Sequence, residues 1–588
     1  MADVETGHWP YVFAPSAPLS PQGQAITDWG LAVDAPLILA DPDAHDWAGE
    51  ADVLIAGLGG AGVAAALDAL ERGLSVIALD RYEGGGSSAA NGGVFYAGGG
   101  TSVQAEAGVE DTPDTMFAYL KLETADIVSD ATLRDFCETS PATVDWMRGH
   151  GVPFEGSLFT GKTSYPPLDK FLYHPDSSLS APYRDVAKPA ARGHRGVGRN
   201  GKLAWGLGKF IFNPLRDSAL KRGLVLHRHA EVKQLALDST GRVIGLRVER
   251  IVDPVQSARF SDLTARADKW FALLPPTLPG APLSYGRGYK LMAKALEIEA
   301  KHRVSHWYRA KKGVALSGGG FIVNKAMVAA LAPKYRDALP NGTLGDTGSG
   351  IMLGVSVGGA TALMERVSGW RFLNPPLAWS QAILVNGRGA RYVNETLYGA
   401  AIGDKMVEEN EGRGYIILDA AARKAALKQA FGKDVLGFQR DITLFNCLIA
   451  ATKARTLDGL ATKLGMDATT LQQTVADYNR AARGEIADPF LKSPAEMAEI
   501  GSGPYYAIDA SVDSKAFPLA CMTVGGLVVE EESGRVRRAD GSLIPGLYAA
   551  GRNAVGLCSH LYVSGLSYAD CIYSGRRAAR HIAGDYTS

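Results

Sequence analysis

The chain has 588 residues, of which 69 are glycine and 46% are apolar, and its formal net charge is −1. The apolar content excludes an intrinsically disordered chain, and the balance of 61 basic against 62 acidic residues excludes nucleic-acid binding through a basic surface. Five cysteines without a C-x-x-C pair exclude a disulfide scaffold and argue against zinc. We therefore expect a globular enzyme with no metal site and no nucleic-acid partner.

The N-terminal sequence, MADVETGHWP, has no basic segment followed by an apolar one, so it predicts no secretory signal. No uncharged apolar run reaches the ~18 residues of a membrane span. These features favour a cytoplasmic protein. Residues 1–50 are rich in Ala, Pro and Asp and predict an extended N-terminal arm.

A nucleotide-binding pattern follows this arm. The buried-strand sequence DVLIAG at 52–57 leads into a helix that reaches about residue 72, and a second strand, SVIALD, ends in Asp80. The turn between the first strand and the helix contains the motif G-x-G-x-x-G, made by Gly57, Gly59 and Gly62. This order is typical of a dinucleotide site, in which the glycines approach the pyrophosphate and the acid binds a ribose hydroxyl. An acid at this position argues against the 2′-phosphate of NADP.

Further along the chain, a second glycine and serine tract at 84–100 suits the lining of the rest of an FAD, and residues 150–200 are expected to be irregular loop. The segments 224–238 and 243–250 predict a β-hairpin. Residues 407–485 are expected to be mainly helical.

An insertion at about 255–310 contains an apolar run broken by prolines and then a basic helix. Its part at 269–304 has two interpretations. A peripheral membrane contact would suit an apolar substrate delivered from a bilayer. The alternative, which we favour, is a helical insertion packed on the nucleotide-binding domain or at a subunit interface.

Near the C-terminus the strand IPGLYAAGR reaches Gly551, and a helix is expected to begin near Gly565. The N-terminus of a helix carries a partial positive charge and free N–H groups. Placed at the edge of a flavin, such a helix would stabilise the anion formed on reduction, which favours FAD over NAD.

Several motifs occur together in the order of a known flavoprotein family. They are VLIAGLGGAGVAAALDALERG, SSAANGGVFYAGGGT, VALSGGGFIVNKAMV, GDTGSGIMLGVSVGGA, NGRGARYVNE, GPYYAI, MTVGGLVVEEESGRV and IPGLYAAGR. The chain therefore resembles the fumarate reductase/3-ketosteroid dehydrogenase superfamily. The resemblance implies an α/β fold with a Rossmann-like FAD-binding domain at about 51–366 and 508–588, interrupted by an α+β clamp domain at about 367–507. The active site would lie between the two.

The motifs and the resemblance together predict a set of FAD-binding residues. These are Gly57, Gly59, Gly60, Ala61, Gly62, Asp80, Arg81, Ser87, Ser88, Asn91, Gly92, Gly93, Val232, Gly318, Gly319, Asp346, Gly551, Arg552, Gly565 and Leu566.

The resemblance also points to a branch of the family. Fumarate reductases place an arginine near the start of the last helix, where this chain has Tyr562, so a dicarboxylate would lose its bidentate partner. The sequence Tyr-x-Ser-Gly at 562–565 is similar instead to the Δ4-dehydrogenases of 3-ketosteroids, and Tyr398 matches a second active-site tyrosine of that branch.

This interpretation implies a mechanism. A base removes the proton next to the ketone while flavin N5 accepts hydride from the neighbouring carbon. A tyrosine has a reference pKa of about 10, so we expect Tyr562 to exchange the proton with help from Ser564 and Tyr398. The N–H of Gly565 is a candidate donor to the substrate or flavin.

The predicted partners are a neutral steroid and an external electron acceptor. Four alternatives stay open at this point: a 3-ketosteroid Δ1-dehydrogenase, the reverse enone reduction, a fumarate reductase-like enzyme and a non-catalytic flavin-binding protein.

Overall fold

The computed structural model describes residues 12–13, 33–199, 204–273 and 281–584. Most of the expected arm at 1–50 lies outside these residues. Strand β2 (Leu37–Leu39) belongs to the described part and adds to the edge of the main sheet beside β10 (Ala230–Asp238).

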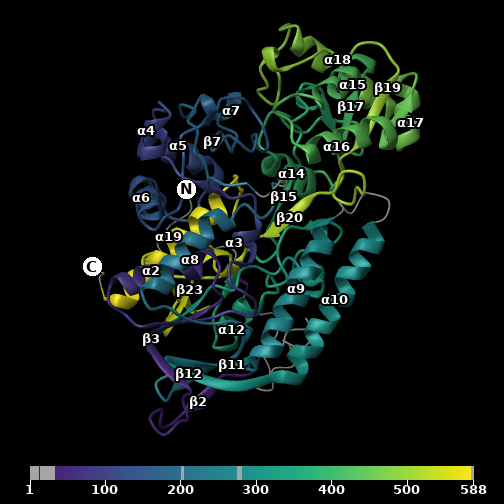
Figure 1. Cartoon of the computed structure of the whole chain (residues 1–588). Helices are drawn as coiled ribbons and strands as arrows, with labels where there is room; N and C mark the ends of the chain where they lie inside the picture. Colours follow the sequence, from purple (N-terminus) through teal and green to yellow (C-terminus); the bar gives the residue numbers. More distant parts are fainter. Residues whose placement is uncertain (1–11, 14–32, 200–203, 274–280, 585–588) are drawn as a thin grey trace.

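The main sheet carries the nucleotide-binding pattern. Its centre is formed by parallel strands: β3 (Gly49–Ala56) lies between β4 (Val76–Leu79) and β12 (Arg303–Leu316), and β23 (Leu543–Ala549) pairs with β12. The strand and helix predictions for 52–80 are confirmed, because α2 (Gly60–Glu71) follows β3 directly. The C-terminal helix α19 (Leu566–Ala583) packs against α2, so the two sequence ends of the domain meet on one face of the sheet (Figure 1).

The predicted hairpin forms from residue 230 onward, whereas the start of the expected first strand is a separate strand, β9 (Val225–His227), which pairs in parallel with β4. Strand β10 pairs antiparallel with β11 (Val243–Ile251), and β11 pairs with β12. Between β11 and β12 the chain forms two helices, α9 (Pro254–Leu273) and α10 (Ala281–His302), which pack against each other. Figure 1 shows them extending together from the sheet toward the clamp domain.

The segment at 150–200 differs from the expected irregular loop. It contributes three short strands, β6 (Leu158–Phe159), β7 (Leu172–Tyr173) and β8 (Gly193–Arg195), to a four-stranded sheet with β5 (Val94–Tyr96). Strands of two or three residues are too short to show the alternation that identifies a strand in a sequence. In addition, β8 pairs with β5, a strand about 100 residues earlier in the sequence.

The clamp domain is built on a second sheet with the strand order β16 (Ile383–Val385), β17 (Tyr415–Leu418), β19 (Tyr505–Asp509), β18 (Thr452–Ala454). Its α-helices are α13 (Leu377–Ser380), α14 (Gly399–Glu409), α15 (Ala420–Gln429), α16 (Gly437–Phe445), α17 (Leu457–Leu464) and α18 (Ala468–Ala482). The clamp domain thus mixes helices and strands. The predicted boundary at 507 falls inside β19.

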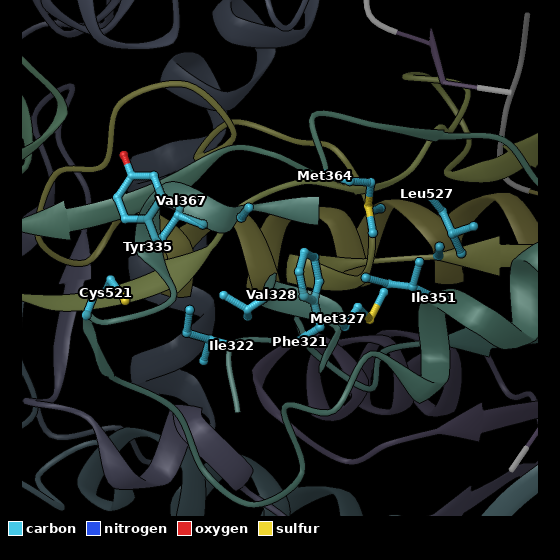
Figure 2. Close-up of a cluster of buried hydrophobic side chains, with 14 of the residues drawn as sticks. Phe321, Ile322, Met327, Val328, Tyr335, Ile351, Met364, Val367, Cys521 and Leu527 are labelled. Carbon is cyan, nitrogen blue, oxygen red and sulfur yellow. The ribbon is translucent and has the colours of Figure 1, made fainter. Parts of the chain in front are cut away.

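The two domains share a core at their junction, where β15 (Val367–Trp370) pairs with β20 (Ala520–Thr523). Figure 2 shows part of this core, in which Phe321 and Met327 lie near Ile351 of α12 (Ser349–Ser356). These buried side chains hold the loops that carry Gly318, Gly319 and Asp346, and thereby position one wall of the site.

Candidate active site

A cavity of about 1050 Å³ lies where the two domains meet. Its walls come from the glycine turn after β3, from the loops that follow β4 and β12, from the start of α19, from the clamp domain and from the α9–α10 pair. Segments from nearly the whole chain therefore converge on one space.

The glycine turn is built so that side chains are excluded. Gly57 has a φ of +97°, a conformation that L side chains rarely adopt. A Cβ on Gly62 would lie 2.2 Å from the carbonyl oxygen of Gly57. The turn consequently brings bare backbone to the cavity wall at the N-terminus of α2, an arrangement that suits a pyrophosphate.

Asp80 lies at the end of β4 and lines the cavity. Its carboxylate accepts hydrogen bonds from the N–H groups of Leu58 (2.8 Å), Tyr82 (2.8 Å) and Gly84 (3.3 Å). Burial raises the pKa of Asp80 although these hydrogen bonds oppose the rise. Asp80 thus ties the glycine turn to the next loop, and its contact with a ribose hydroxyl stays a prediction.

A buried ion pair also lines the cavity. Arg552 Nη2 donates to Asp346 Oδ1 over 2.7 Å, and the Ser87 hydroxyl donates to the other oxygen of Asp346. Arg552 Nη1 is buried and has no hydrogen-bond partner among the described residues. The site therefore keeps an unused donor beside the cavity, which fits an oxygen-rich cofactor.

Arg81 is held at the same end of the cavity by the insertion. Its guanidinium forms a bidentate pair with Glu299 of α10, with distances of 3.0 and 2.8 Å, and lies 3.3 Å from Glu231. Arg303 contacts both of these carboxylates. The network links the base of α10 to the cavity wall.

Sixteen of the twenty residues predicted to bind FAD line the cavity. They are Gly57, Gly59, Gly60, Ala61, Asp80, Arg81, Ser87, Ser88, Asn91, Gly92, Val232, Gly318, Gly319, Asp346, Gly551 and Arg552. Gly62, Gly93, Gly565 and Leu566 do not line it. Gly62 packs beneath Gly57, and Gly93 packs against Leu207.

At the other end of the cavity, Tyr562, Ser564 and Tyr398 come together as predicted from distant segments. Burial raises the pKa of Tyr562 to about 12, and hydrogen bonding to Gly565 and Ser564 opposes the rise. Burial likewise raises the pKa of Tyr398 well above its usual value, although hydrogen bonding to Ser564 lowers it in part. Both hydroxyls are therefore neutral at physiological pH and share one serine.

Two features of this end differ from the expectation. The N–H of Gly565, expected to face the substrate or flavin, donates to the Tyr562 hydroxyl over 3.1 Å. In addition, Tyr173 of β7 donates to Ser564 over 3.2 Å from a fully buried position behind the cavity wall. Tyr173 was missed because it lies in a two-residue strand, and no motif distinguishes it from other tyrosines.

Aromatic rings surround the hydroxyl groups. Trp370 packs on Tyr562 with 5.2 Å between ring centroids, and Phe372 packs on Tyr398 at 5.4 Å. Both rings also line the cavity. This end of the cavity is thus an apolar space with a few neutral hydroxyls, suited to a flat, uncharged ligand.

The insertion at about 255–310, which includes the segment 269–304, packs on the FAD-binding domain. Phe260 of α9 stacks on Tyr82 at 6.1 Å, and α9 and α10 enclose a core of their own that Tyr82 and Leu344 join. The interpretation that we favoured from the sequence, a packed helical insertion, agrees with this geometry. Among the described residues, no helix is both long enough and apolar enough to cross a bilayer.

The donors and the bare-backbone turn fit FAD. When bound, the cofactor would have its pyrophosphate held by the 57–62 turn and its far end near Asp80 and Val232. Its redox-active ring would lie toward the start of α19.

Comparisons with known proteins agree with this fit. Residues 52–565 match the model of the FAD binding domain family, FAD_binding_2. The chain is 34% identical to the 3-oxo-5-alpha-steroid 4-dehydrogenase of Comamonas testosteroni, over 88% of this chain and 95% of that protein. It is 26% identical to the 3-oxosteroid 1-dehydrogenase of Mycolicibacterium smegmatis, over 87% and 93% of the two chains.

The fold is also similar to a solved structure, the 3-ketosteroid-Δ4-(5α)-dehydrogenase of Rhodococcus jostii RHA1 in complex with 4-androstene-3,17-dione. That match has a TM-score of 0.75 and 28% identity, and covers 93% of this chain and 99% of the other. The chain therefore belongs to the FAD binding domain family and is a flavin-dependent oxidoreductase.

Proposed function

We propose that the protein is an FAD-dependent 3-ketosteroid dehydrogenase that introduces the Δ4 double bond. The observation that carries this proposal is the cluster at the apolar end of the cavity, where Tyr562, Ser564 and Tyr398 line one space and Tyr173 donates a hydrogen bond to Ser564 from behind its wall. The similarity to two Δ4-type steroid dehydrogenases supports it.

The hydroxyl cluster suits the removal of a proton next to a ketone. Because the pKa of Tyr562 is raised to about 12, this side chain does not act as a standing anion. It takes the proton from the substrate while its own proton passes to Ser564, and the Ser564 hydroxyl releases its proton in turn toward solvent. Tyr398 and Tyr173 stabilise the charge that develops during this transfer. When bound, FAD supplies the hydride acceptor for the neighbouring carbon.

The cations of the cavity argue against a dicarboxylate substrate. Within the described part of the chain, the arginines that line the cavity are Arg81 and Arg552, and both are paired with carboxylates. A dicarboxylate needs an unpaired cation to replace its hydration. A neutral steroid has no such need, so the fumarate reductase-like alternative is disfavoured.

An anaerobic reduction experiment tests the proposal. We expect the yellow colour of the purified flavoprotein to bleach on addition of a 3-ketosteroid with a saturated A ring. Bleaching by a 4-ene-3-ketosteroid instead would favour a Δ1-dehydrogenase. Reduced protein that recovers its colour with an enone would show that the same site also runs the reverse reaction. No bleaching by any 3-ketosteroid would refute the proposal.

The proposal includes two partners. An external electron acceptor must reoxidise the flavin, and dyes of different potential would identify its class. A peripheral membrane contact of this cytoplasmic enzyme has one observation in its favour: the outer side of α10 carries Leu283 and Tyr289, which are 78% and 62% exposed, beside Arg287 and Lys290. Co-sedimentation with anionic vesicles tests this contact.

A further inference from the structure

The mouth of the cavity is framed by aromatic side chains. Among the residues that line the cavity, Trp205 and Phe438 are also well exposed, at 42% and 46%, so they mark where it opens. Phe271 of α9 and Tyr285 of α10 are half-buried and line the same cavity. In Figure 1 the ends of α9 and α10 reach toward α16, the helix that begins at Gly437 and carries Phe438.

The end of the α9–α10 pair is shaped to hold Phe271 in place. A glycine inside a helix costs helix stability, yet α10 contains Gly288 in its third turn. A Cβ at Gly288 would lie 2.6 Å from the ring of Phe271. The Phe271 ring also contacts Tyr285 at 5.9 Å and Tyr289 at 5.2 Å. Gly288 thus leaves room for the Phe271 ring against the backbone of α10.

Apolar side chains continue along the cavity from Phe271 and Tyr285 toward the hydroxyl groups of Tyr562 and Tyr398. One face of α16 turns Phe438, Ile442 and Phe445 toward the cavity, at the i, i+4, i+7 spacing of a helix face. Seven residues of helix span about 10 Å. The row of apolar side chains continues along Phe517 and Pro375 to Phe372, which packs on Tyr398. The apolar space therefore extends well beyond the hydroxyl cluster.

We propose that Phe271 and Tyr285 form a specificity wall that binds the hydrocarbon side chain of the substrate, so that 3-ketosteroids bearing such a side chain on ring D are preferred. This inference rests on the proposed function, because it assumes that the ketone lies at Tyr562. With the ketone there, the opposite end of a rigid steroid points along α16 toward the mouth, where aromatic rings exclude water from an apolar chain.

Two glycine variants give a matched test. Gly288→Ala places a methyl group against the Phe271 ring, whereas Gly286→Ala, two residues earlier in the same helix, places one where no atom lies within 4 Å. Both substitutions improve helix propensity equally. We expect Gly288→Ala to lower the preference for a side-chain-bearing 3-ketosteroid over a 17-ketone by about fivefold to tenfold, and Gly286→Ala to leave it unchanged. Phe271→Ala should lower the preference by about tenfold or more.

The preference is measured in two ways, as a ratio of kcat/KM values and as a ratio of dissociation constants from the change in flavin absorbance. The second ratio requires no turnover. If both steroids bind the Phe271→Ala protein with the native ratio, the specificity wall is refuted while the proposed function stands. If neither steroid binds or reduces the native flavoprotein, the proposed function itself is refuted, and the wall with it.

Discussion

The two ends of the cavity are constructed in different ways. At the cofactor end the walls are bare backbone and buried ion pairs, such as the Gly57 turn and the Arg552–Asp346 pair. At the substrate end they are aromatic rings and neutral hydroxyls, such as Trp370 and Tyr562. A charged cofactor that is common to a whole family needs a backbone cradle, whereas a neutral substrate is selected by side chains. Substitutions at the two ends should therefore affect different measurements.

The largest effect is expected from Tyr562→Phe. The change removes the hydroxyl to which we assign the exchange of the substrate proton in the proposed mechanism, but keeps the ring that packs on Trp370. We expect turnover of a saturated 3-ketosteroid to fall by about 10²- to 10⁴-fold, with FAD content and flavin spectrum unchanged. Tyr505→Phe, at a clamp-domain tyrosine that does not line the cavity, serves as the control. Turnover within a few fold of the native value would refute the role of Tyr562.

The next effect is expected at the opposite end, from Gly62→Ala. The added methyl group would lie 2.2 Å from the Gly57 carbonyl and must displace the turn. Displacement of a packed backbone costs about 1–3 kcal/mol, so we expect FAD to bind roughly tenfold to hundredfold more weakly. Gly149→Ala, which meets no atom within 4 Å, is the matched control. A native FAD dissociation constant in Gly62→Ala would show that the turn does not hold the cofactor.

The same contrast explains what the sequence predicted well. The cofactor end could be recognised in the sequence because a tight turn and a close backbone approach admit only glycine. The structure of the turn therefore appears in the sequence as glycines at fixed spacing. Sixteen of the predicted residues consequently line the cavity. Gly62, Gly93, Gly565 and Leu566 do not, since a motif identifies the residues that shape a turn as well as those that face the ligand.

The substrate end was only partly predictable. Tyr562 and Ser564 lie in a short motif, but Tyr173 reaches Ser564 across 391 residues of sequence through the small β5–β8 sheet. The rings of Phe271 and Tyr285 reach the cavity only because two helices pair and extend to the mouth. Contacts of this kind depend on tertiary packing, and a single sequence holds no local pattern for them.

A smaller effect is expected where the insertion meets the cofactor end. Glu299→Gln removes the charge that holds Arg81 in a bidentate pair while keeping the shape of the side chain. We expect the FAD dissociation constant, measured by flavin fluorescence, to rise by about fivefold to tenfold. Glu297→Gln, on the exposed side of the same helix, should leave the constant unchanged. Equal behaviour of the two variants would mean that α10 does not influence cofactor binding.

The smallest effect concerns the support behind the substrate end. Glu123 is fully buried and accepts a hydrogen bond of 2.5 Å from Tyr119, whose hydroxyl also accepts from the N–H of Ser177. The Ser177 hydroxyl in turn accepts from the N–H of Tyr398. Burial raises the pKa of Glu123 from 4.5 to about 8. The contribution of this network to the stability of the protein therefore depends on pH, whereas a turn made of glycine backbone has no group that titrates.

The sign of the response follows from linkage. Between pH 4.5 and about 8 the unfolded chain has released the Glu123 proton and the folded chain still holds it, so stability falls as pH rises through this window. Glu123→Gln has no proton to release. We therefore expect the native Tm to fall by about 1–3 °C more than that of the variant between about pH 5 and about pH 8. Glu297→Gln, at an exposed glutamate, should follow the native curve, and the same slope in Glu123→Gln would show that Glu123 is already ionised in the folded protein.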